Sequence, residues 1–233
     1  MGEPSRVLAI GDIHGVASAL DALLEVVAPS PDDLVITLGD YVDRGIDSAG
    51  VIERIIKLSA RCQLVPLRGN HEEMMLDARR GPEFLELWKR LGGDTALMSY
   101  APDEDAPGLE RIPDSHWHLL EHTCRDIYES DSHLFVHGGV DPKLPLDQQS
   151  PAVLRWQTFP PPQPHPCGKI VVCGHTPQRS GVPAALPHAI CIDTAIHRGG
   201  WLTCLNVPSG HYWQANERGE IREAVLSAPK RRW

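Results

Sequence analysis

Six polar side chains of metal-ligand type follow short apolar segments at five places along the chain. They comprise two carboxylates, three imidazoles and one amide, and every one lies on a turn that contains glycine. Glycine permits tight turns and lets a ligand approach the backbone closely. Such a mixed set suits Mn, Fe or Zn better than Ca or Mg alone. The six residues are Asp12, His14, Asp40, Asn70, His137 and His175.

The number of candidate ligands indicates two ions. Six ligands are too many for one catalytic ion that keeps open positions, and they are about right for two ions that share one carboxylate. Paired ions roughly 3.5–4 Å apart stabilise both the attacking and the leaving oxygen of phosphoryl transfer, and they acidify a water between them. We expect Asp40 to be the shared ligand. The sequence therefore predicts a dinuclear centre for phosphate chemistry.

Three further polar residues accompany these ligands. Arg44, in the GDYVDRG loop, is suited to hold a phosphate through a bidentate contact. His71 follows Asn70 directly and is a candidate general acid that protonates the leaving oxygen. Asp43 is a reasonable orienting partner for His71. The alternative is structural: Asp43 and Arg44 would form a local salt bridge, and His71 would only begin a helix.

The segments that must position these residues form an α/β pattern. Three apolar strands alternate with amphipathic helices at residues 16–28 and 47–60, in the order βαβαβ. In open α/β sheets ligands bind outside the carboxyl ends of the strands, where these polar turns lie. The later strands follow one another without helices, so the fold is of the α/β or α+β class. The predicted strands are residues 6–10, 34–38, 62–67, 133–136, 169–173, 189–192, 201–207 and 212–215.

The middle of the chain differs from both halves. Helical patches separated by Gly-Pro and Gly-Gly pairs predict a helical insertion at about residues 79–131. We expect it to belong to a single domain spanning residues 1–233 and to shape the substrate cleft.

Composition limits the partners. The 233 residues carry a formal net charge of −9, which argues against nucleic-acid or membrane-surface binding. No apolar run approaches the roughly 20 residues of a membrane span. The chain shows no secretory signal, and its six cysteines form no C-x-x-C pair. We therefore expect a cytoplasmic protein, most simply a monomer.

Five short motifs in order along the chain carry a family resemblance. The chain resembles the calcineurin-like metallophosphoesterases, and specifically the PPP-type serine/threonine protein phosphatases of bacterial and phage kind. The resemblance implies a two-sheet β-sandwich flanked by helices, with a dinuclear metal centre at the strand ends. The motifs are GDIHG at Gly11, GDYVDRG at Gly39, GNHE at Gly69, HGG at His137 and GHT at Gly174.

The same resemblance assigns roles to the site residues. It implies that Asp12, His14 and Asp40 hold one metal, and that the other is held by Asp40, Asn70, His137 and His175. His71 resembles the general acid of the family, supported by Asp43. Arg44 resembles a phosphate-binding arginine, and the resemblance implies that Asn70 also contacts the phosphate. Manganese is the typical metal of bacterial relatives. The family has a second substrate arginine, for which Arg155 is the candidate, although a surface position beside Trp156 is an equal alternative.

Three functions follow from this pattern. The leading one is hydrolysis of phosphoserine or phosphothreonine in proteins by direct attack of metal-bound hydroxide. The second is hydrolysis of small phosphorylated compounds, notably diadenosine tetraphosphate. The third is a catalytically inactive phosphate-binding module, which the complete set of expected ligands disfavours.

Overall fold

The framework of the protein is a pair of β-sheets. The computed structural model describes residues 4–101, 103, 107–161 and 163–226. The first sheet has six strands in the order β11-β10-β9-β1-β2-β3, of which β1, β2 and β3 are parallel. The other three run antiparallel to their neighbours. The strands are β1 (Val7–Ile10), β2 (Leu34–Thr37), β3 (Gln63–Pro66), β9 (Leu202–Asn206), β10 (His211–Ala215) and β11 (Ile221–Val225).

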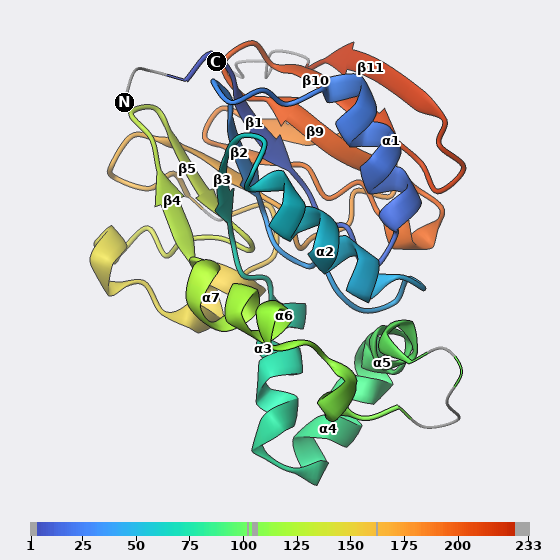
Figure 1. The fold of residues 1–233 in the computed structure, drawn as a ribbon. Helices are drawn as coiled ribbons and strands as arrows, with labels where there is room; N and C mark the ends of the chain where they lie inside the picture. The colour runs from blue at the N-terminus through green and yellow to red at the C-terminus, as the bar shows by residue number, and fades with distance from the viewer. Residues whose placement is uncertain (1–3, 102, 104–106, 162, 227–233) are drawn as a thin grey trace.

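The second sheet has five strands in the order β4-β5-β6-β8-β7. Its three central strands are parallel, and the edge strands β4 and β7 are antiparallel to them. The two sheets pack face to face with helices outside them, so the predicted sandwich is confirmed (Figure 1). The strands are β4 (Ile127–Glu129), β5 (His133–Val136), β6 (Ile170–Cys173), β7 (Ala184–Leu186) and β8 (Ala189–Cys191).

The strand sequences explain the layers, because alternate side chains of a strand point to opposite faces. Ile36 of β2 and Phe135 of β5 meet in the apolar cluster between the sheets. Val35 faces the other way, toward the helices that cover the first sheet. Leu134 and Val136 face the outer side of the second sheet. Strands β2 and β5 are covered on both faces, which is why their sequences are continuous apolar runs.

Helices cover the outer faces of the sandwich. Helix α1 (Ala17–Val27) and helix α2 (Ser48–Leu58) lie over the first sheet (Figure 1). The short helix α7 (Pro151–Trp156) buries Leu154 against the second sheet. Strands β1, β2 and β3 run parallel, as do β5 and β6, so the polar turns that follow them lie at the carboxyl edge of each sheet.

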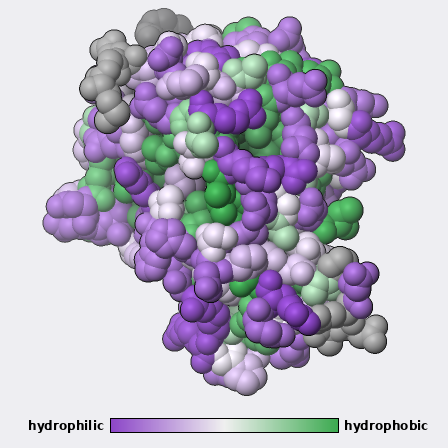
Figure 2. Space-filling model, viewed as in Figure 1, coloured by the Kyte–Doolittle hydropathy of each residue, from purple (hydrophilic) through white to green (hydrophobic). Residues whose placement is uncertain are grey.

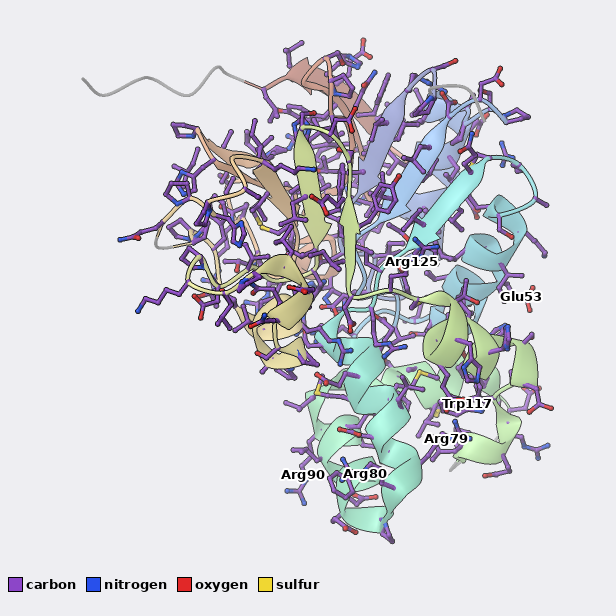
Figure 3. The ribbon with its side chains drawn as sticks, turned by 90° about the vertical axis from the view of Figure 1, so that its left-hand side faces the viewer. Glu53, Arg79, Arg80, Arg90, Trp117 and Arg125 are labelled. Atoms are coloured by element: carbon purple, nitrogen blue, oxygen red, sulfur yellow. The ribbon has the colours of Figure 1, made fainter. Side chains whose placement is uncertain are left out.

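The predicted helical insertion projects from this edge of the sandwich (Figure 1). A cation–π contact helps to hold it together, with the guanidinium of Arg79 lying 4.7 Å from the ring centroid of Trp117 (Figure 3). No helix in the described part of the chain is long and apolar enough to cross a membrane. The face in Figure 2 is mostly hydrophilic, with small hydrophobic patches. The α-helices within the insertion are α4 (Pro82–Trp88), α5 (Asp94–Tyr100) and α6 (Asp114–His118), and helix α3 (Asn70–Asp77) precedes it.

Several elements differ from the prediction. The helical insertion was expected to continue to about residue 131, but its last helical turn ends at Thr123 and the chain then forms the edge strand β4. Three-residue strands carry too little pattern to be recognised, and pairing with β5 decides the conformation of β4. Strand β11 was not predicted, because most of its side chains are exposed and it shows no apolar alternation. Helix α7 was also missed.

Candidate dinuclear metal centre

The loops that follow β1, β2, β3, β5 and β6 bring all six predicted ligands together. Two groups of ligand atoms form, each with all atoms within 4.8 Å of one another. One contains His14 and Asp40 together with His71, the predicted general acid, and the other contains Asp40, His137 and His175. The predicted ligand Asp12 belongs to neither group. Asp40 belongs to both, which is the arrangement expected of a shared carboxylate.

The two oxygens of Asp40 face opposite groups. Its Oδ2 lies 3.5 Å from Nε2 of His14, and its Oδ1 lies 3.3 Å from Nε2 of His137. Asn70 joins the second group, since its Oδ1 lies 3.0 Å from Nε2 of His137 and 2.9 Å from Nδ1 of His175. The Asp12 carboxylate adjoins the same place and accepts the backbone N–H of His175 at 3.0 Å.

Backbone carbonyls fix two of the imidazoles. Nδ1 of His14 donates to the carbonyl of Val42 at 3.0 Å, and Nδ1 of His137 donates to the carbonyl of Leu38 at 2.8 Å. Each ring therefore presents its Nε2 toward Asp40. A hydrogen bond to the far nitrogen is the usual way in which proteins orient a metal-binding histidine.

The electrostatics of the cluster also fit bound cations. Burial raises the pKa of Asp12, and the neighbouring carboxylate of Asp193 raises it further. Burial alone would raise the pKa of Asp40 too, but the positive charge on His137 and His71 outweighs it and holds that pKa well below its usual range. Divalent cations would stabilise both carboxylates in the ionised form. The donor types and their burial therefore fit two divalent ions.

Backbone strain is concentrated in these loops. The five non-glycine residues His14, Asp40, Asp43, Arg44 and His175 have positive φ values, between 48° and 72°. This left-handed conformation is uncommon for residues with a side chain and is typical of functional sites. Gly39 precedes Asp40 with φ +100°, and a Cβ there would lie 2.4 Å from the backbone nitrogen of Gly69. Close packing of the second and third loops therefore requires that glycine.

A residue that the sequence analysis did not single out holds the central loop in place. Glu72 is fully buried, and its carboxylate accepts the backbone N–H groups of Asp40 at 2.7 Å, Tyr41 at 2.7 Å and Gly69 at 2.8 Å. Burial and the nearby Asp40 raise the pKa of Glu72 to about 7. The GNHE motif contained this signal, since a glutamate at the third helical position commonly accepts N–H groups at the start of its helix.

The remaining catalytic candidates contact one another beside the cluster. Nδ1 of His71 is 2.6 Å from Oδ2 of Asp43, and Nε2 of His71 is 2.9 Å from Nη2 of Arg44. Burial lowers the pKa of His71, but the carboxylates of Asp40 and Asp43 outweigh it and the pKa is raised. Asp43 thus contacts His71, as the orienting role requires, and Arg44 points into the site.

His197 is a second residue that sequence reasoning missed. Its Nε2 lies 3.2 Å from Nη1 of Arg44, and its ring centroid is 4.6 Å from that of His14. Burial and the charge of Arg44 lower its pKa to about 4. It lies in a short 3₁₀ turn (Ile196–Arg198) rather than in any of the five motifs, and 153 residues separate it from Arg44.

Arg155 lies at the end of helix α7 and is engaged by two carboxylates. Its Nε and Nη2 donate to Asp126 at 2.9 and 2.6 Å, and its Nη1 donates to Glu73 at 2.6 Å. Glu73 also accepts the indole N–H of Trp156 at 2.8 Å, and that ring borders His175. Arg155 is thus buried next to the site, with its guanidinium already paired.

Comparison with known proteins places the chain in a family. The family model described as calcineurin-like phosphoesterase matches residues 5–193. The chain belongs to the calcineurin-like phosphoesterase family. The predicted superfamily is therefore confirmed, and the five motifs lie within the matched region.

Relatives of this phosphoesterase carry two kinds of name. A serine/threonine-protein phosphatase 1 from Salmonella typhimurium is 40% identical over 138 residues, which are 57% of this chain and 58% of that protein. A symmetrical bis(5'-nucleosyl)-tetraphosphatase from Acidovorax sp. is 35% identical over 141 residues, 60% of this chain and 46% of that protein. The phosphoesterase thus spans about half the length of the curated relatives it matches.

Solved structures support the fold of the phosphoesterase. A crystal structure described as a putative diadenosine tetraphosphatase superposes with a TM-score of 0.62 and covers 95% of both chains at 21% identity. Because the identity is so low, this likeness concerns the fold alone.

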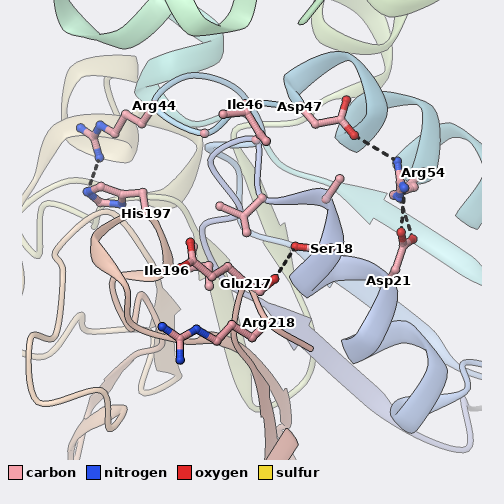
Figure 4. A pocket seen from close by; sticks show the side chains of 14 residues that line it. Ser18, Asp21, Arg44, Ile46, Asp47, Arg54, Ile196, His197, Glu217 and Arg218 are labelled. Atoms are coloured by element: carbon pink, nitrogen blue, oxygen red, sulfur yellow. Dashed lines mark hydrogen bonds and ion pairs between the residues drawn. The ribbon is translucent and has the colours of Figure 1, made fainter. Parts of the chain in front are cut away.

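A groove lies next to the candidate ligands of the phosphoesterase (Figure 4). It has a volume of about 690 Å³ and is bordered at one end by Arg44 and His197. Ile46, which is 89% exposed, lines it together with the buried Ile196. On the opposite wall Arg54 is paired with Asp21 at 2.6 Å. Six charged residues line this groove, three of each sign: Asp21, Arg44, Asp47, Arg54, Glu217 and Arg218.

Proposed function

We propose that this phosphoesterase is a metal-dependent phosphomonoesterase that hydrolyses phosphoserine or phosphothreonine in proteins. The observation that carries the proposal is the position of Asp40, which belongs to two separate groups of ligand atoms. His71 lies in one of these groups, and its Nε2 is 2.9 Å from Nη2 of Arg44. Family membership and the 40% identity to a bacterial protein phosphatase support it.

We propose that two divalent cations, most simply Mn²⁺, with Fe or Zn as alternatives, are held by the six predicted ligands. When bound, such ions activate a water and stabilise charge on the phosphoryl oxygens. One is assigned to Asp12, His14 and Asp40. The other is assigned to Asp40, Asn70, His137 and His175. Neutral imidazole nitrogens, carboxylates and one amide oxygen are suitable donors for these metals.

The residues around the metal ligands would bind the substrate and move one proton. Arg44 is placed to hold the phosphate oxygens, and Asn70 to contact them beside its metal. His71 donates a proton to the leaving oxygen of serine or threonine, because such an alkoxide is a poor leaving group without protonation. Asp43 holds the His71 ring in the orientation for that transfer. Arg155 remains a prediction as a second phosphate ligand, and its pairing with Glu73 and Asp126 argues against that role.

The groove favours a polypeptide over a dinucleotide. A nucleobase usually stacks on an aromatic side chain. The described residues that line the groove include no Phe, Tyr or Trp, and the exposed Ile46 offers an apolar contact instead. Its balanced charges would also attract a polyanionic dinucleotide only weakly. Diadenosine tetraphosphate nevertheless stays the second candidate, because relatives carry that name.

The experiment that tests this proposal compares two substrates on one preparation. The purified protein is stripped of metal, manganese is added, and kcat/KM is measured for a phosphoserine peptide and for diadenosine tetraphosphate. We expect a large preference for the peptide. A large preference for the dinucleotide would overturn the substrate assignment and leave the metal centre intact. Two bound metals with no turnover of either substrate would instead support a phosphate-binding module.

A further inference from the structure

Trp88 joins the helical insertion to the proposed proton donor. It is the last residue of helix α4, only 1% exposed, and its Nε1 lies 3.0 Å from Oδ1 and 2.9 Å from Oδ2 of Asp43. An indole N–H can only donate, so the Asp43 carboxylate accepts. The same Oδ2 accepts from Nδ1 of His71 at 2.6 Å. Two side chains from different elements therefore fix one fully buried carboxylate.

The segment after Trp88 is shaped so that the indole reaches Asp43. Gly93 lies against the ring, and a Cβ at Gly93 would be 2.4 Å from ring atoms. Gly92, at φ +114°, presents its carbonyl to the backbone N–H of Arg44 at 3.1 Å. The insertion thus contacts both the residue that orients His71 and the residue assigned to phosphate binding.

Without the indole N–H, the carboxylate of Asp43 would lose one of the two side chains that fix its orientation, and it could rotate. Asp43 is 0% exposed, so no bulk water would replace the lost donor. A buried carboxylate that loses a hydrogen bond turns toward other donors. Its Oδ2 would then move relative to Nδ1 of His71, and the ring would lose its alignment.

We propose that Trp88 is a positioning residue that holds Asp43 in the orientation that aligns His71 for protonation of the leaving group. This inference rests on the proposed function, in which His71 supplies that proton. The indole N–H of Trp88 donates to Asp43, which is not one of the assigned metal ligands. Its effect should therefore depend on how much the leaving group needs a proton.

The test measures how the loss of kcat in a Trp88 variant depends on the basicity of the leaving group. Trp88→Phe removes the N–H and keeps an aromatic ring. On phenyl phosphate, whose leaving phenolate is strongly basic, we expect kcat to fall about tenfold to 100-fold, part of the effect of a general acid. On 4-nitrophenyl phosphate, whose leaving group is weakly basic, we expect a change of less than about threefold. KM for both should stay nearly constant, since Arg44 remains in place.

Trp117→Phe is the matched control, because Trp117 is a nearly buried tryptophan of the same insertion that packs on Arg79 instead (Figure 3). It should leave the ratio of the two kcat values unchanged. If Trp88→Phe does not fold, Gly93→Ala carries the same test, because its methyl would displace the indole without removing it.

The outcomes separate this inference from the proposed function. Equal losses of kcat on both aryl phosphates, or no loss, would overturn the role of Trp88 while His71→Asn still showed the leaving-group dependence. If wild-type protein turned over neither aryl phosphate, or if His71→Asn showed no such dependence, the proposed function of His71 would fail and this inference with it.

Discussion

Arg155 offers the sharpest test of how the rim of the site is built. Arg155→Met keeps the length and apolar character of the side chain and removes the guanidinium. Three charge-assisted hydrogen bonds disappear, two to Asp126 and one to Glu73. If pairing is the main role of Arg155, stability should suffer more than catalysis. If Arg155 binds the substrate phosphate, the reverse is expected.

The expected loss follows from the exposure of the three groups. Removing one partner of a fully buried ion pair costs roughly 3–5 kcal/mol. The side chain of Arg155 is only 7% exposed, but Glu73 and Asp126 are 27% and 32% exposed, so water can hydrate the carboxylates that remain. We therefore expect a smaller loss of about 2–3 kcal/mol in the free energy of unfolding.

The assay is urea unfolding of the wild type and the variant, with kcat/KM for a phosphoserine peptide measured on the folded protein. Arg90→Met is the control, because Arg90 is exposed on the insertion (Figure 3), and its loss should change stability by less than about 0.5 kcal/mol. We expect kcat/KM of Arg155→Met to fall less than about tenfold. Unchanged stability with a loss of kcat/KM of about 100-fold or more would refute this reasoning and assign Arg155 to phosphate binding.

Three further predictions concern the metal centre, the core and the groove. Asp40→Asn should lower the manganese bound per chain by at least half, measured by elemental analysis, whereas the exposed Asp32→Asn should not. Hydrogen bonding to Arg6 lowers the pKa of Asp33 from 3.8 to about 2, so Asp33→Asn should cost about 2 kcal/mol at pH 7. Because the folded pKa is depressed, that difference is full above pH 3.8 and should vanish in urea titrations as the pH falls toward 2. Ile46→Asp should raise KM for a phosphopeptide about tenfold and leave KM for 4-nitrophenyl phosphate unchanged. Equal changes of KM for both substrates would show that the peptide does not bind in the groove.

The convergence of the candidate metal ligands was predictable because each follows a recognisable strand and lies beside a glycine. Each strand ends at the carboxyl edge of its sheet, and the glycine allows the chain to turn there. The sequence alone therefore predicts that Asp12, Asp40 and the other candidate ligands lie at that edge. The sandwich itself followed from the family resemblance, since periodicity indicated only an α/β half and a β half. Monomeric state and cytoplasmic location stay predictions.

The long-range contacts of the supporting residues were not predictable, because these partners are distant in the sequence. Glu72 reaches Asp40 across 32 positions, and Trp88 reaches Asp43 across 45. A glutamate at the start of a helix and a tryptophan at the end of one are ordinary features, and periodicity assigns both to packing. Only the fold brings their polar atoms to the loop. The edge strand β4 was missed for the same reason, since pairing with β5 rather than local pattern determines it.

The arrangement of the site separates the choice of reaction from the choice of substrate. The metal ligands come from the ends of the core strands, and relatives named for protein and for dinucleotide substrates align over 57% and 60% of this chain. Similarity over more than half of the chain therefore does not distinguish the two kinds of relative. The insertion and the groove adjoin the ligands chiefly through the loop of Asp43 and Arg44, where Trp88 and Gly92 reach it. Substitutions in the groove away from that loop should change which phosphate ester enters the site. Substitutions within the loop, or at Trp88 that contacts it, should change how the ester is cleaved.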